Sequence, residues 1–298
     1  MIKVRVPATT ANFGAGFDCL GMAISLYNYV YMDWSDRLLI KSLDGTRIPT
    51  NNLNLVYKSA EYLFKLSGKK DFKSLKILQK NNVPKARGLG SSSCCIVAGL
   101  FGANALLGSV FKKKELLNIA TKLEGHPDNV APCMFGGFVV SSVENEKVFY
   151  VRNNVSYNLK FVFFIPNFKL STEKSRKILK DKIDLKDAVY NISRSSLLVS
   201  SILKGKFSNL EVSTKDKLHQ DYRLKYIENG KEIFDISYKL GAYGVFLSGA
   251  GPSIVAIYDR SNISFEKEAS LKLKEKGIVN FSISKLDVDK GGVVAQIT

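Results

Sequence analysis

The sequence predicts an α+β fold made of two domains. Stretches with the alternating pattern of a strand and stretches with helical spacing follow one another without a strict strand–helix–strand rhythm, which disfavours a parallel α/β sheet. The chain has 298 residues, of which 45% are apolar, so it can bury one large core or two modest ones. A polar stretch at 152–158 separates two strand patterns, and we therefore predict domains at 1–155 and 156–298.

Hydrophobic spacing predicts the elements of the first half. Strands are predicted at 2–8, within 26–41, at 73–79, at 135–142 and at 147–151, with loops at 9–21 and 84–90. Helices are predicted at 53–67, at 91–107, at 112–123 and in the stretch leading to Val130. The first of these helices is the clearest, because four apolar residues recur on one helical face: Val56, Ala60, Leu63 and Phe64.

The second half has the same mixed character. Helices are predicted at 172–180, 184–204, 222–240 and 264–276, and strands at 159–165, 245–247, 254–258 and 278–285. The strands at 245–247 and 254–258 flank a glycine-rich turn, which is typical of a hairpin.

Composition excludes several classes of protein. No run of 18 or more apolar residues occurs, so we expect no membrane-spanning helix, and the first seven residues alternate like a strand and not like a signal peptide. Two histidines are too few for a histidine-based zinc site, and no cysteines form a Cys-x-x-Cys pair. We expect a cytoplasmic protein with four small, buried cysteines: Cys19, Cys94, Cys95 and Cys133.

The net charge of +17 is the compositional anomaly. Such a charge is typical of a protein that binds nucleic acid, of one that binds an acidic substrate, or of a protein with a lysine-rich surface. The basic residues are dispersed along the chain, and Lys112–Lys114 is their longest run. We interpret the charge as solvated surface whose positive field attracts ATP, and we expect no nucleic-acid partner. A basic nucleic-acid-binding protein stays the remote alternative.

A glycine–serine loop between a predicted strand and a long helix is the most informative segment. It comprises Pro84, Lys85, Ala86, Arg87, Gly88, Leu89, Gly90, Ser91, Ser92, Ser93 and Cys94. The two glycines allow backbone angles closed to other residues, and the serines open a helix whose first amides lack internal partners. Such an end attracts anions, although an ordinary helix cap after a glycine turn has the same local pattern. The spacing matches neither a Walker A loop nor a Rossmann fingerprint.

The loop resembles the nucleotide loop of the GHMP kinases, Pro-x-x-x-Gly-Leu-Gly-Ser-Ser, without a gap. The resemblance implies a ribosomal S5 domain 2-like N-terminal domain that binds ATP and a ferredoxin-like C-terminal domain. It implies ATP as co-substrate, with the loop wrapped around its phosphates and Ser91 nearest Mg²⁺. Cys94 and Cys95 replace the usual Ala or Ser, and we expect little consequence because cysteine is nearly as small.

The N-terminal block Val6–Gly21 places an amide, Asn12, and a carboxylate, Asp18, six residues apart in a glycine-rich loop. Such a loop can bring both to one pocket, where Asp18 can accept hydrogen bonds from an ammonium group; an Asx turn with a solvated Asp is the commoner reading. The block resembles the start of the homoserine kinases within the GHMP family, which implies that Asn12 and Asp18 contact the substrate. Thr10, Phe13 and Ala15 depart from that pattern conservatively.

Polar groups also cluster between Glu124 and Asn129. Carboxylates near a triphosphate are usual Mg²⁺ ligands. The segment Glu-Gly-His-Pro-Asp-Asn-Val-Ala-Pro matches that of the homoserine kinases at every position. The match implies Glu124 as a Mg²⁺ ligand with Ser91, His126 and Asp128 as contacts of homoserine, and Asn129 beside the reacting hydroxyl.

Two arginines and a third glycine-rich motif complete the pattern. Arginine is the natural bidentate partner of a carboxylate. By family position, Arg176 and Arg223 are the candidates that clamp the carboxylate of homoserine, with Thr172 near its hydroxyl. The resemblance thus implies Asn129, Thr172 and Arg176 as the catalytic residues. The motif at 244–253 resembles the C-terminal GHMP motif, and we interpret it as structural support for the phosphate loop.

Together the motifs predict ATP-dependent phosphorylation of L-homoserine. Several GHMP kinases use an Asp as base where this chain has Asn129, which cannot take a proton, so we expect positioning and electrostatics to dominate. A mevalonate-type GHMP kinase is the alternative within the class. Family precedent favours a homodimer, although no sequence feature indicates one.

Overall fold

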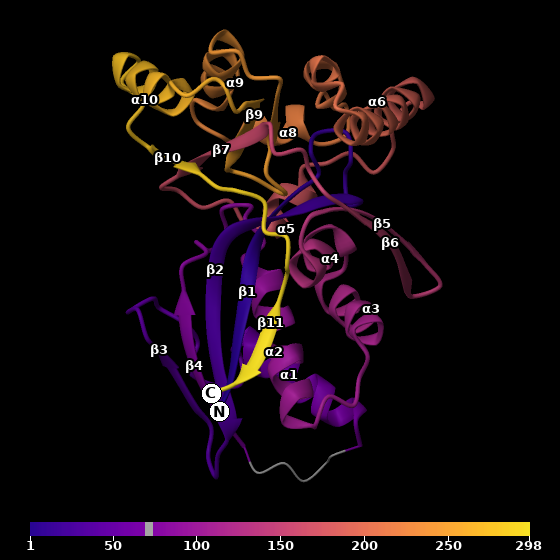
Figure 1. Cartoon of the computed structure of the whole chain (residues 1–298), viewed down its shortest axis with the longest axis vertical. Helices are drawn as coiled ribbons and strands as arrows, with labels where there is room; N and C mark the ends of the chain where they lie inside the picture. The colour runs from indigo at the N-terminus through magenta and orange to yellow at the C-terminus, as the bar shows by residue number, and fades with distance from the viewer. Residues whose placement is uncertain (69–73) are drawn as a thin grey trace.

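The computed structural model describes residues 1–68 and 74–298 and has two sheets, each packed against helices. Figure 1 shows an elongated molecule with the first sheet and helices α1–α4 in its lower half. The second sheet and helices α5–α10 form the upper half. The predicted α+β class is confirmed.

The first sheet joins the two ends of the chain. Its strands are β1 (Ile2–Ala11), β2 (Leu20–Trp34), β3 (Leu39–Ser42), β4 (Leu75–Asn81), β5 (Phe138–Glu144), β6 (Lys147–Asn153) and β11 (Val294–Ile297). Their order is β11-β1-β2-β4-β3, with β5 paired to β2 and to β6. The β11–β1 pairing brings the C-terminus next to the N-terminus, as Figure 1 shows.

Four helices cover one face of this sheet: α1 (Leu55–Leu66), α2 (Ser91–Leu106), α3 (Lys113–Glu124) and α4 (Pro127–Phe135). Apolar residues of β1 such as Val4 and Val6 point into this layer, while Lys3 and Arg5 are half-exposed, as the alternation of a strand requires. All four apolar residues predicted on the inner face of the first helix are buried. The helical spacing of 53–67 is therefore confirmed.

The second sheet has the antiparallel order β10-β7-β9-β8. Its strands are β7 (Leu159–Pro166), β8 (Gly244–Leu247), β9 (Ile254–Asp259) and β10 (Phe281–Lys285). The helices of this half are α5 (Thr172–Lys177), α6 (Leu185–Lys204), α7 (Leu210–Ser213), α8 (Gln220–Leu224), α9 (Gly230–Lys239) and α10 (Phe265–Glu275), with a short 3-10 turn at Phe207–Asn209 before α7.

Strand β7 is buried on both faces and connects the two halves. Phe161 and Phe163 belong to the core that continues from the first sheet, whereas Val162 and Phe164 belong to a second core under α9 and α10. Successive side chains of a strand point to opposite faces, so one strand contributes to both cores. The two halves are therefore packed against each other through apolar side chains.

Several predicted boundaries are wrong. The helix predicted at 222–240 is two helices, because the chain turns at Asn229, whose φ of 58° is left-handed, before α9 begins at Gly230. The strand predicted from residue 135 begins at Phe138, because Gly136 and Gly137, with φ of 69° and 72°, end helix α4 and redirect the chain.

Other predicted helices and strands differ from the observed ones only at their ends. The helix predicted at 172–180 ends at Lys177, and the strand predicted at 278–285 begins at Phe281. The first residue of the strand predicted at 73–79 lies outside the described residues, and β4 runs from Leu75 to Asn81. Strand β11 was not predicted. The predicted domain boundary falls between β6 and β7, and β11 then returns to the first sheet.

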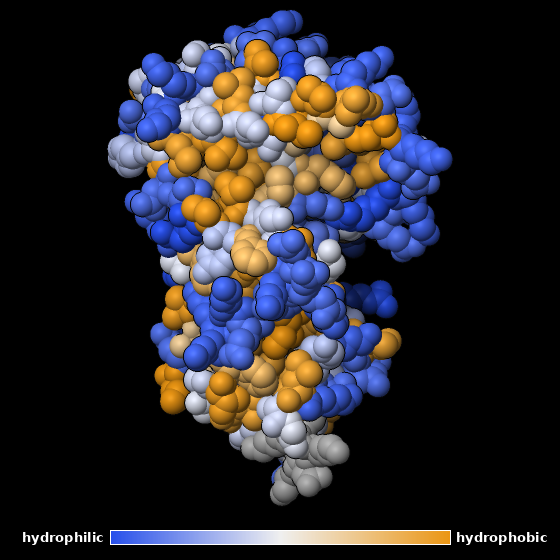
Figure 2. Space-filling model, turned by 90° about the vertical axis from the view of Figure 1, so that its right-hand side faces the viewer, coloured by the Kyte–Doolittle hydropathy of each residue, from blue (hydrophilic) through white to orange (hydrophobic). Residues whose placement is uncertain are grey.

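The surface carries both polar and apolar areas. Figure 2 shows apolar residues gathered over the upper half on the side where α6 lies. Helix α6 carries several exposed apolar side chains, among them Leu185, Val189 and Ile192 with exposed fractions of 80%, 56% and 65%. Within residues 1–68 and 74–298, no helix combines the length and the apolar character that a bilayer span requires. The predicted homodimer and the predicted absence of a nucleic-acid partner both stay predictions.

Candidate functional site

A cavity of about 800 Å³ lies where the two halves meet. Its walls include the glycine–serine loop from Lys85 to Ser92, which was predicted to bind a nucleotide. One group of lining residues is charged: Asp18, Glu124, His126, Asp128, Arg176 and Arg223. Another group is mainly apolar or carries amides: Ile48, Pro49, Leu53, Asn54, Leu55 and Gln79.

The two glycines of the loop allow backbone contacts that a side chain would block. Gly88 and Gly90 have φ of 75° and 67°, and a Cβ at Gly90 would lie 2.0 Å from Thr9 Oγ1. A Cβ at Gly88 would lie 2.1 Å from the carbonyl oxygen of Ser248. Leu89 between them is buried, so the loop is anchored in the core while its backbone faces the cavity.

The motif at 244–253 supports this loop. The Ser248 hydroxyl donates to the Gly88 carbonyl at 2.6 Å and lies 2.9 Å from Thr10 Oγ1. The Gly249 carbonyl accepts from Asn12 Nδ2 at 2.8 Å and from Arg223 Nη1 at 3.1 Å. These contacts agree with the structural role predicted for the motif.

The loop's cationic side chains are held by backbone carbonyls of the protein. Lys85 Nζ donates to Arg47 O at 2.9 Å, and Arg87 donates from Nε to Pro166 O at 2.7 Å and from Nη2 to Asn167 O at 2.6 Å. These contacts use part of the donor capacity of both side chains. The Arg87 bonds tie the loop to the end of strand β7 in the other half.

The cysteines behind the loop differ in exposure. Cys94 is fully buried, and its Sγ lies 3.3 Å from Pro7 O, so this predicted loop residue faces the core. Cys133 is also buried, whereas Cys19 and Cys95 are partly exposed and Cys95 lines the cavity. The prediction of four buried cysteines is thus right for two of them.

Glu124, at the end of α3, lies against the start of helix α2. Its Oε1 accepts hydrogen bonds from Ser92 Oγ at 2.5 Å and from Ser93 Oγ at 3.0 Å. The sequence predicts Ser91 and Glu124 as joint Mg²⁺ ligands, and that assignment stays a prediction. Among the described residues, however, it is the next two hydroxyls that bond to this carboxylate, because they point back along the first turn of α2 toward α3.

The loop between β1 and β2 adopts left-handed backbone angles at Asn12 and Asp18, with φ of 73° and 59°. Asn12 Oδ1 accepts from the Asp18 amide at 3.0 Å, and its Nδ2 donates to Gly249 O. Asn12 lines the cavity, but both ends of its amide already bond to the backbone. Its side chain therefore fixes the position of Asp18, a role that the predicted contact with substrate did not include.

Asp18, His126 and Asp128 form a compact cluster. One ligand-capable atom from each lies within 4.8 Å of the others, and His126 Nδ1 contacts Asp128 Oδ1. Burial would lower the pKa of His126, but the hydrogen bond and charge of Asp128 outweigh it and raise this pKa above its usual value. The cluster thus concentrates two carboxylates beside one histidine and brings Asp18 of the N-terminal block next to the segment of His126 and Asp128.

Asn129 is held from both sides. Its Oδ1 accepts from Thr9 Oγ1 at 2.7 Å, and its Nδ2 donates to Asp128 Oδ1 at 3.2 Å. The side chain lines the cavity and is buried. It is a fixed, uncharged group. Thr172, the first residue of α5, also lines the cavity and is exposed.

The two arginines predicted to form a clamp both line the cavity but differ in their partners. Arg176 donates to both carboxylate oxygens of Asp18, at 3.0 and 2.6 Å. Burial would lower the pKa of Arg176, and the hydrogen bond and charge of Asp18 raise it instead. Among the described residues no carboxylate forms an ion pair with Arg223, which is 1% exposed.

Arg223 is fixed by neutral acceptors. Its Nε donates to Ser175 O at 3.3 Å, and its Nη1 donates to His219 Nδ1 at 3.0 Å and to Gly249 O. Burial lowers the pKa of Arg223 to about 10, and the charge of Arg176 acts in the same direction. The guanidinium is therefore a buried cation at neutral pH whose protein partners carry no negative charge.

Sequence reasoning missed two groups of site residues. The first comprises Ile48, Leu53, Asn54 and Gln79, where the amides of Asn54 and Gln79 bond to each other at 2.7 Å. The second is His219, which supports Arg223 from the preceding turn. Only its position four residues before Arg223 could have suggested His219. The residues of the first group come from separate loops and strands, so no sequence motif marks them as part of one site.

Two family models match the chain. The GHMP kinases N terminal domain matches residues 54–137, and the GHMP kinases C terminal domain matches residues 199–271. A homoserine kinase of Clostridium beijerinckii is 46% identical over 296 residues, which cover 98% of this chain and 97% of that protein. The chain belongs to the GHMP kinase family.

A second relative and a solved structure also support membership of the GHMP kinase family. A homoserine kinase of Clostridium botulinum strain Alaska E43 is 43% identical over 298 residues, covering 99% of this chain and 98% of that protein. The crystal structure of homoserine kinase from Cytophaga hutchinsonii is similar with a TM-score of 0.87 at 29% identity, covering 99% and 97% of the two chains. The predicted GHMP kinase fold is confirmed, and the protein is a kinase with ATP as co-substrate.

Proposed function

We propose that this GHMP kinase transfers the γ-phosphate of ATP to the side-chain hydroxyl of L-homoserine. One observation carries the proposal: beside the phosphate loop, the cavity presents the buried guanidinium of Arg223, which forms no ion pair with a carboxylate of the described residues, and a cluster of carboxylates. An amino acid in its zwitterionic form complements both. The names of the two Clostridium relatives described above support the same acceptor.

The carboxylate of the acceptor is assigned to Arg223, with Arg176 as its second contact. Leaving a buried guanidinium unpaired is costly, and an anionic ligand relieves that cost. Arg223 Nη2 is the nitrogen that donates to no protein acceptor among the described residues, so it is available to a ligand. Arg176 and Arg223 both pack near the ring of Phe17, with Cζ to centroid distances of 5.4 and 5.3 Å.

The ammonium group of the acceptor is assigned to Asp18 and Asp128. These carboxylates lie in one cluster, and each can accept hydrogen bonds from a cation. Asp18 pairs with Arg176, so the ammonium group either shares this carboxylate or replaces the guanidinium on one oxygen. Mevalonate and galactose carry no ammonium group, which makes them poorer complements of this cluster.

ATP is assigned to the rest of the cavity. The amides at the start of α2 and the backbone of Gly88 and Gly90 are suited to the phosphates, because a helix N-terminus favours negative charge. The apolar and amide-bearing group around Leu53 and Asn54 is suited to the base. The field of a +17 protein adds general attraction for the nucleotide.

Mg²⁺ is proposed to accompany ATP. The carboxylate of Glu124 and the hydroxyls of Ser92 and Ser93 form a set of oxygen donors at the start of α2, which is the donor type that Mg²⁺ prefers. Ser91, which also lines the cavity, stays a predicted ligand. When bound, Mg²⁺ supplies neutralisation of phosphate charge.

We propose that the chain needs no strong base. Phosphoryl transfer through a loose transition state depends mainly on alignment and on charge stabilisation. Asn129 is uncharged and fixed by Thr9 and Asp128, so it can hold the hydroxyl in place but cannot take its proton. The proton then passes to phosphate or to water.

A panel of acceptors tests the function. ADP release is measured with L-homoserine, mevalonate, galactose and shikimate, and we expect turnover with L-homoserine alone. Two fragments sharpen the test: 4-hydroxybutyrate lacks the ammonium group and 3-aminopropan-1-ol lacks the carboxylate. We expect each to lose at least about 10-fold in kcat/KM. 3-Aminopropan-1-ol leaves the buried guanidinium of Arg223 without an anionic ligand, and 4-hydroxybutyrate offers no cationic donor to the carboxylates of Asp18 and Asp128.

Other outcomes would identify the alternatives. Turnover with mevalonate and none with L-homoserine would overturn the proposal in favour of a mevalonate-type kinase. Retention of RNA or duplex DNA at physiological salt, with a steep salt dependence, would indicate a nucleic-acid-binding role. We also propose a cytoplasmic location, which the four free cysteines support.

A further inference from the structure

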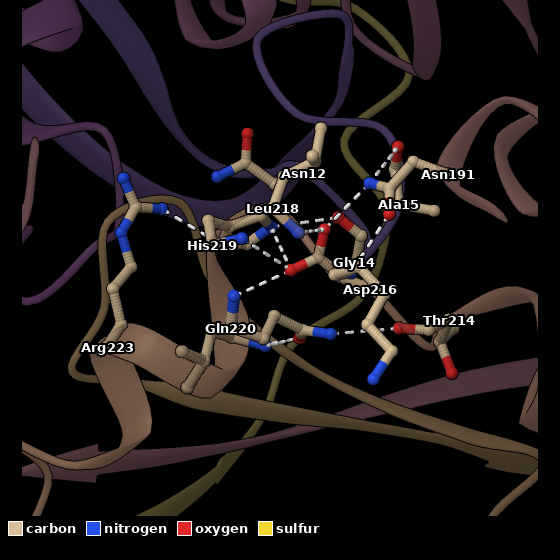
Figure 3. Close-up of polar contacts among 12 residues, drawn as sticks. Asn12, Gly14, Ala15, Asn191, Thr214, Asp216, Leu218, His219, Gln220 and Arg223 are labelled. Atoms are coloured by element: carbon tan, nitrogen blue, oxygen red, sulfur yellow. Dashed lines mark hydrogen bonds and ion pairs between the residues drawn. The ribbon is translucent and has the colours of Figure 1, made fainter. Parts of the chain in front are cut away.

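We infer that His219 is a positioning residue of the acceptor site: it orients the guanidinium of Arg223 and connects it to the loop that carries Asp18. This inference rests on the proposed function, because Arg223 is the residue assigned to the substrate carboxylate. Figure 3 shows the side chains of His219 and Arg223 facing each other, with the Gly14 segment on the far side of the imidazole.

The two ring nitrogens of His219 have different partners. Nε2 lies 2.8 Å from the carbonyl oxygen of Gly14, and Nδ1 lies 3.0 Å from Arg223 Nη1. A carbonyl can only accept and a guanidinium can only donate, so Nε2 carries the proton and Nδ1 is bare. The partners therefore fix one neutral tautomer of a ring that is fully buried.

The backbone around His219 is held by one carboxylate. Asp216 accepts hydrogen bonds from the amides of Leu218, His219 and Gln220 at 2.9, 2.7 and 2.6 Å, as Figure 3 shows. Asn191 Nδ2 of helix α6 donates to the same side chain at 2.7 Å. These bonds hold the backbone of the turn that leads into α8, so the Cα of His219 is fixed beside Arg223.

The contact from His219 completes the orientation of Arg223. Nε and Nη1 of this guanidinium are directed at Ser175 O, Gly249 O and His219 Nδ1, which leaves Nη2 for the cavity. All three acceptors are neutral, so they orient the cation without cancelling its charge. An Asp or Glu in place of His219 would pair with the guanidinium and compete with the substrate carboxylate.

The Gly14 contact extends the role to the other half of the site. Gly14 belongs to the loop that holds Asn12 and Asp18, and a Cβ on it would lie 1.9 Å from the carbonyl oxygen of Thr214. The loop therefore packs directly on the segment that precedes His219. Through its two nitrogens, the ring links the loop for the substrate ammonium to the arginine for the substrate carboxylate.

Two substitutions separate the two hydrogen bonds of the ring. In H219N the Oδ1 atom stands as many bonds from Cα as Nδ1, so it can accept from Arg223, but the contact to Gly14 is lost. In H219Q the Nε2 atom stands where the ring Nε2 was and can donate to Gly14, but the acceptor for Arg223 is lost. KM and kcat for L-homoserine and for ATP are measured for both variants and for the wild type.

We expect H219Q to raise the KM for L-homoserine roughly 10- to 100-fold, as for the loss of a hydrogen bond to a charged group. H219N should raise it less, about 2- to 10-fold, since it keeps the bond to Arg223 and loses only the contact to the Gly14 carbonyl. The KM for ATP should be unchanged in both variants. Equal effects of the two variants on the homoserine KM, or parallel effects on the ATP KM, would reduce His219 to a packing residue and overturn the inference.

A second measurement uses the wild-type protein and needs neither variant nor turnover. The chain has two histidines, His126 and His219, so a ¹⁵N spectrum of the imidazoles contains two sets of signals. We expect one ring to stay neutral at pH 7 with its proton on Nε2. A proton on Nδ1 of His219 would refute the orientation of Arg223, whereas absence of homoserine turnover with the expected tautomer would refute only the proposed function.

Discussion

Replacing Arg223 with methionine tests the proposed acceptor site most directly. The change removes a guanidinium that is 1% exposed and that has three neutral acceptors and no carboxylate partner among the described residues. Methionine keeps most of the apolar stem and fills the space without a charge. We therefore expect the fold to persist, with the effect concentrated on the substrate that carries a carboxylate.

The magnitude follows from the surroundings of the guanidinium. Truncating one partner of a buried, hydrogen-bonded charge pair costs about 2–5 kcal/mol, which corresponds to roughly 30-fold to several thousand-fold in affinity. Arg176 remains as a second, partly exposed cation, so the lower part of this range applies. We expect the KM for L-homoserine to rise roughly 30- to 300-fold in R223M.

Stability should change much less than affinity. The substitution leaves Ser175 O, Gly249 O and His219 Nδ1 without this donor, which costs stability. It also removes a buried charge that forms no ion pair within residues 1–68 and 74–298, which is a gain of the opposite sign. Thermal unfolding of R223M should confirm that the protein is folded at the assay temperature.

A coupled ADP-release assay, with L-homoserine and ATP varied in turn, gives the result. The KM for ATP should stay within about 2-fold of the wild type, because Arg223 bonds to no residue of the phosphate loop. Arg194 on α6 offers a matched control, since it also donates to a backbone carbonyl but does not line the cavity. If R223M and R194M bind L-homoserine equally well, the assignment of the carboxylate to Arg223 is wrong.

Three further predictions concern the loop, the proton and pH. G90A should raise the KM for ATP at least about 10-fold, because a Cβ at this position, where φ is +67°, would lie 2.0 Å from the Thr9 hydroxyl. G45A is the control: its φ is +74°, but no atom lies within 4 Å of the added Cβ, so the KM for ATP should not change. Similar ATP kinetics for both variants would contradict the steric argument. N129D should lower kcat about 10-fold or more, because a carboxylate there repels phosphate, and a large gain in turnover would show that a base had been missing. Burial lowers the pKa of His219 from 6.5 to about 4. Between pH 6.5 and pH 4 the unfolded chain therefore binds a proton that the folded chain does not. The free energy of unfolding should fall by up to about 3 kcal/mol when the pH is lowered through this range. Urea unfolding at several pH values should show this loss in the wild type and lack it in H219N; the same slope in both would refute the assignment.

Much of the site could be predicted because its parts lie in continuous segments. Glycines in the phosphate loop predict backbone angles that other residues rarely adopt, and Gly88 and Gly90 do have left-handed conformations in the structure. Both predicted arginines line one cavity with Asp18 and His126. These residues were found because a motif fixes local geometry and chemistry together.

The choice of the serine next to Glu124 could not be made from the motif. Ser91, Ser92 and Ser93 are consecutive, and successive residues of a helix point about 100° apart. Only the packing of α3 on α2 decides which hydroxyls meet the carboxylate, and these are Ser92 and Ser93. The side chain of Asn12 shows the same limit, since its bond to Gly249 joins residues 237 positions apart.

By itself the sequence determined the family, the α+β class and the segments that form the site. The tertiary structure decided which charges are paired. Asp18 forms an ion pair with Arg176 and so neutralises part of the charge of that guanidinium. Arg223 contacts the neutral His219, so its charge remains available to an anionic ligand. The physical reason is that a local pattern fixes backbone conformation within a segment, whereas burial and ion pairing depend on which segments meet in space.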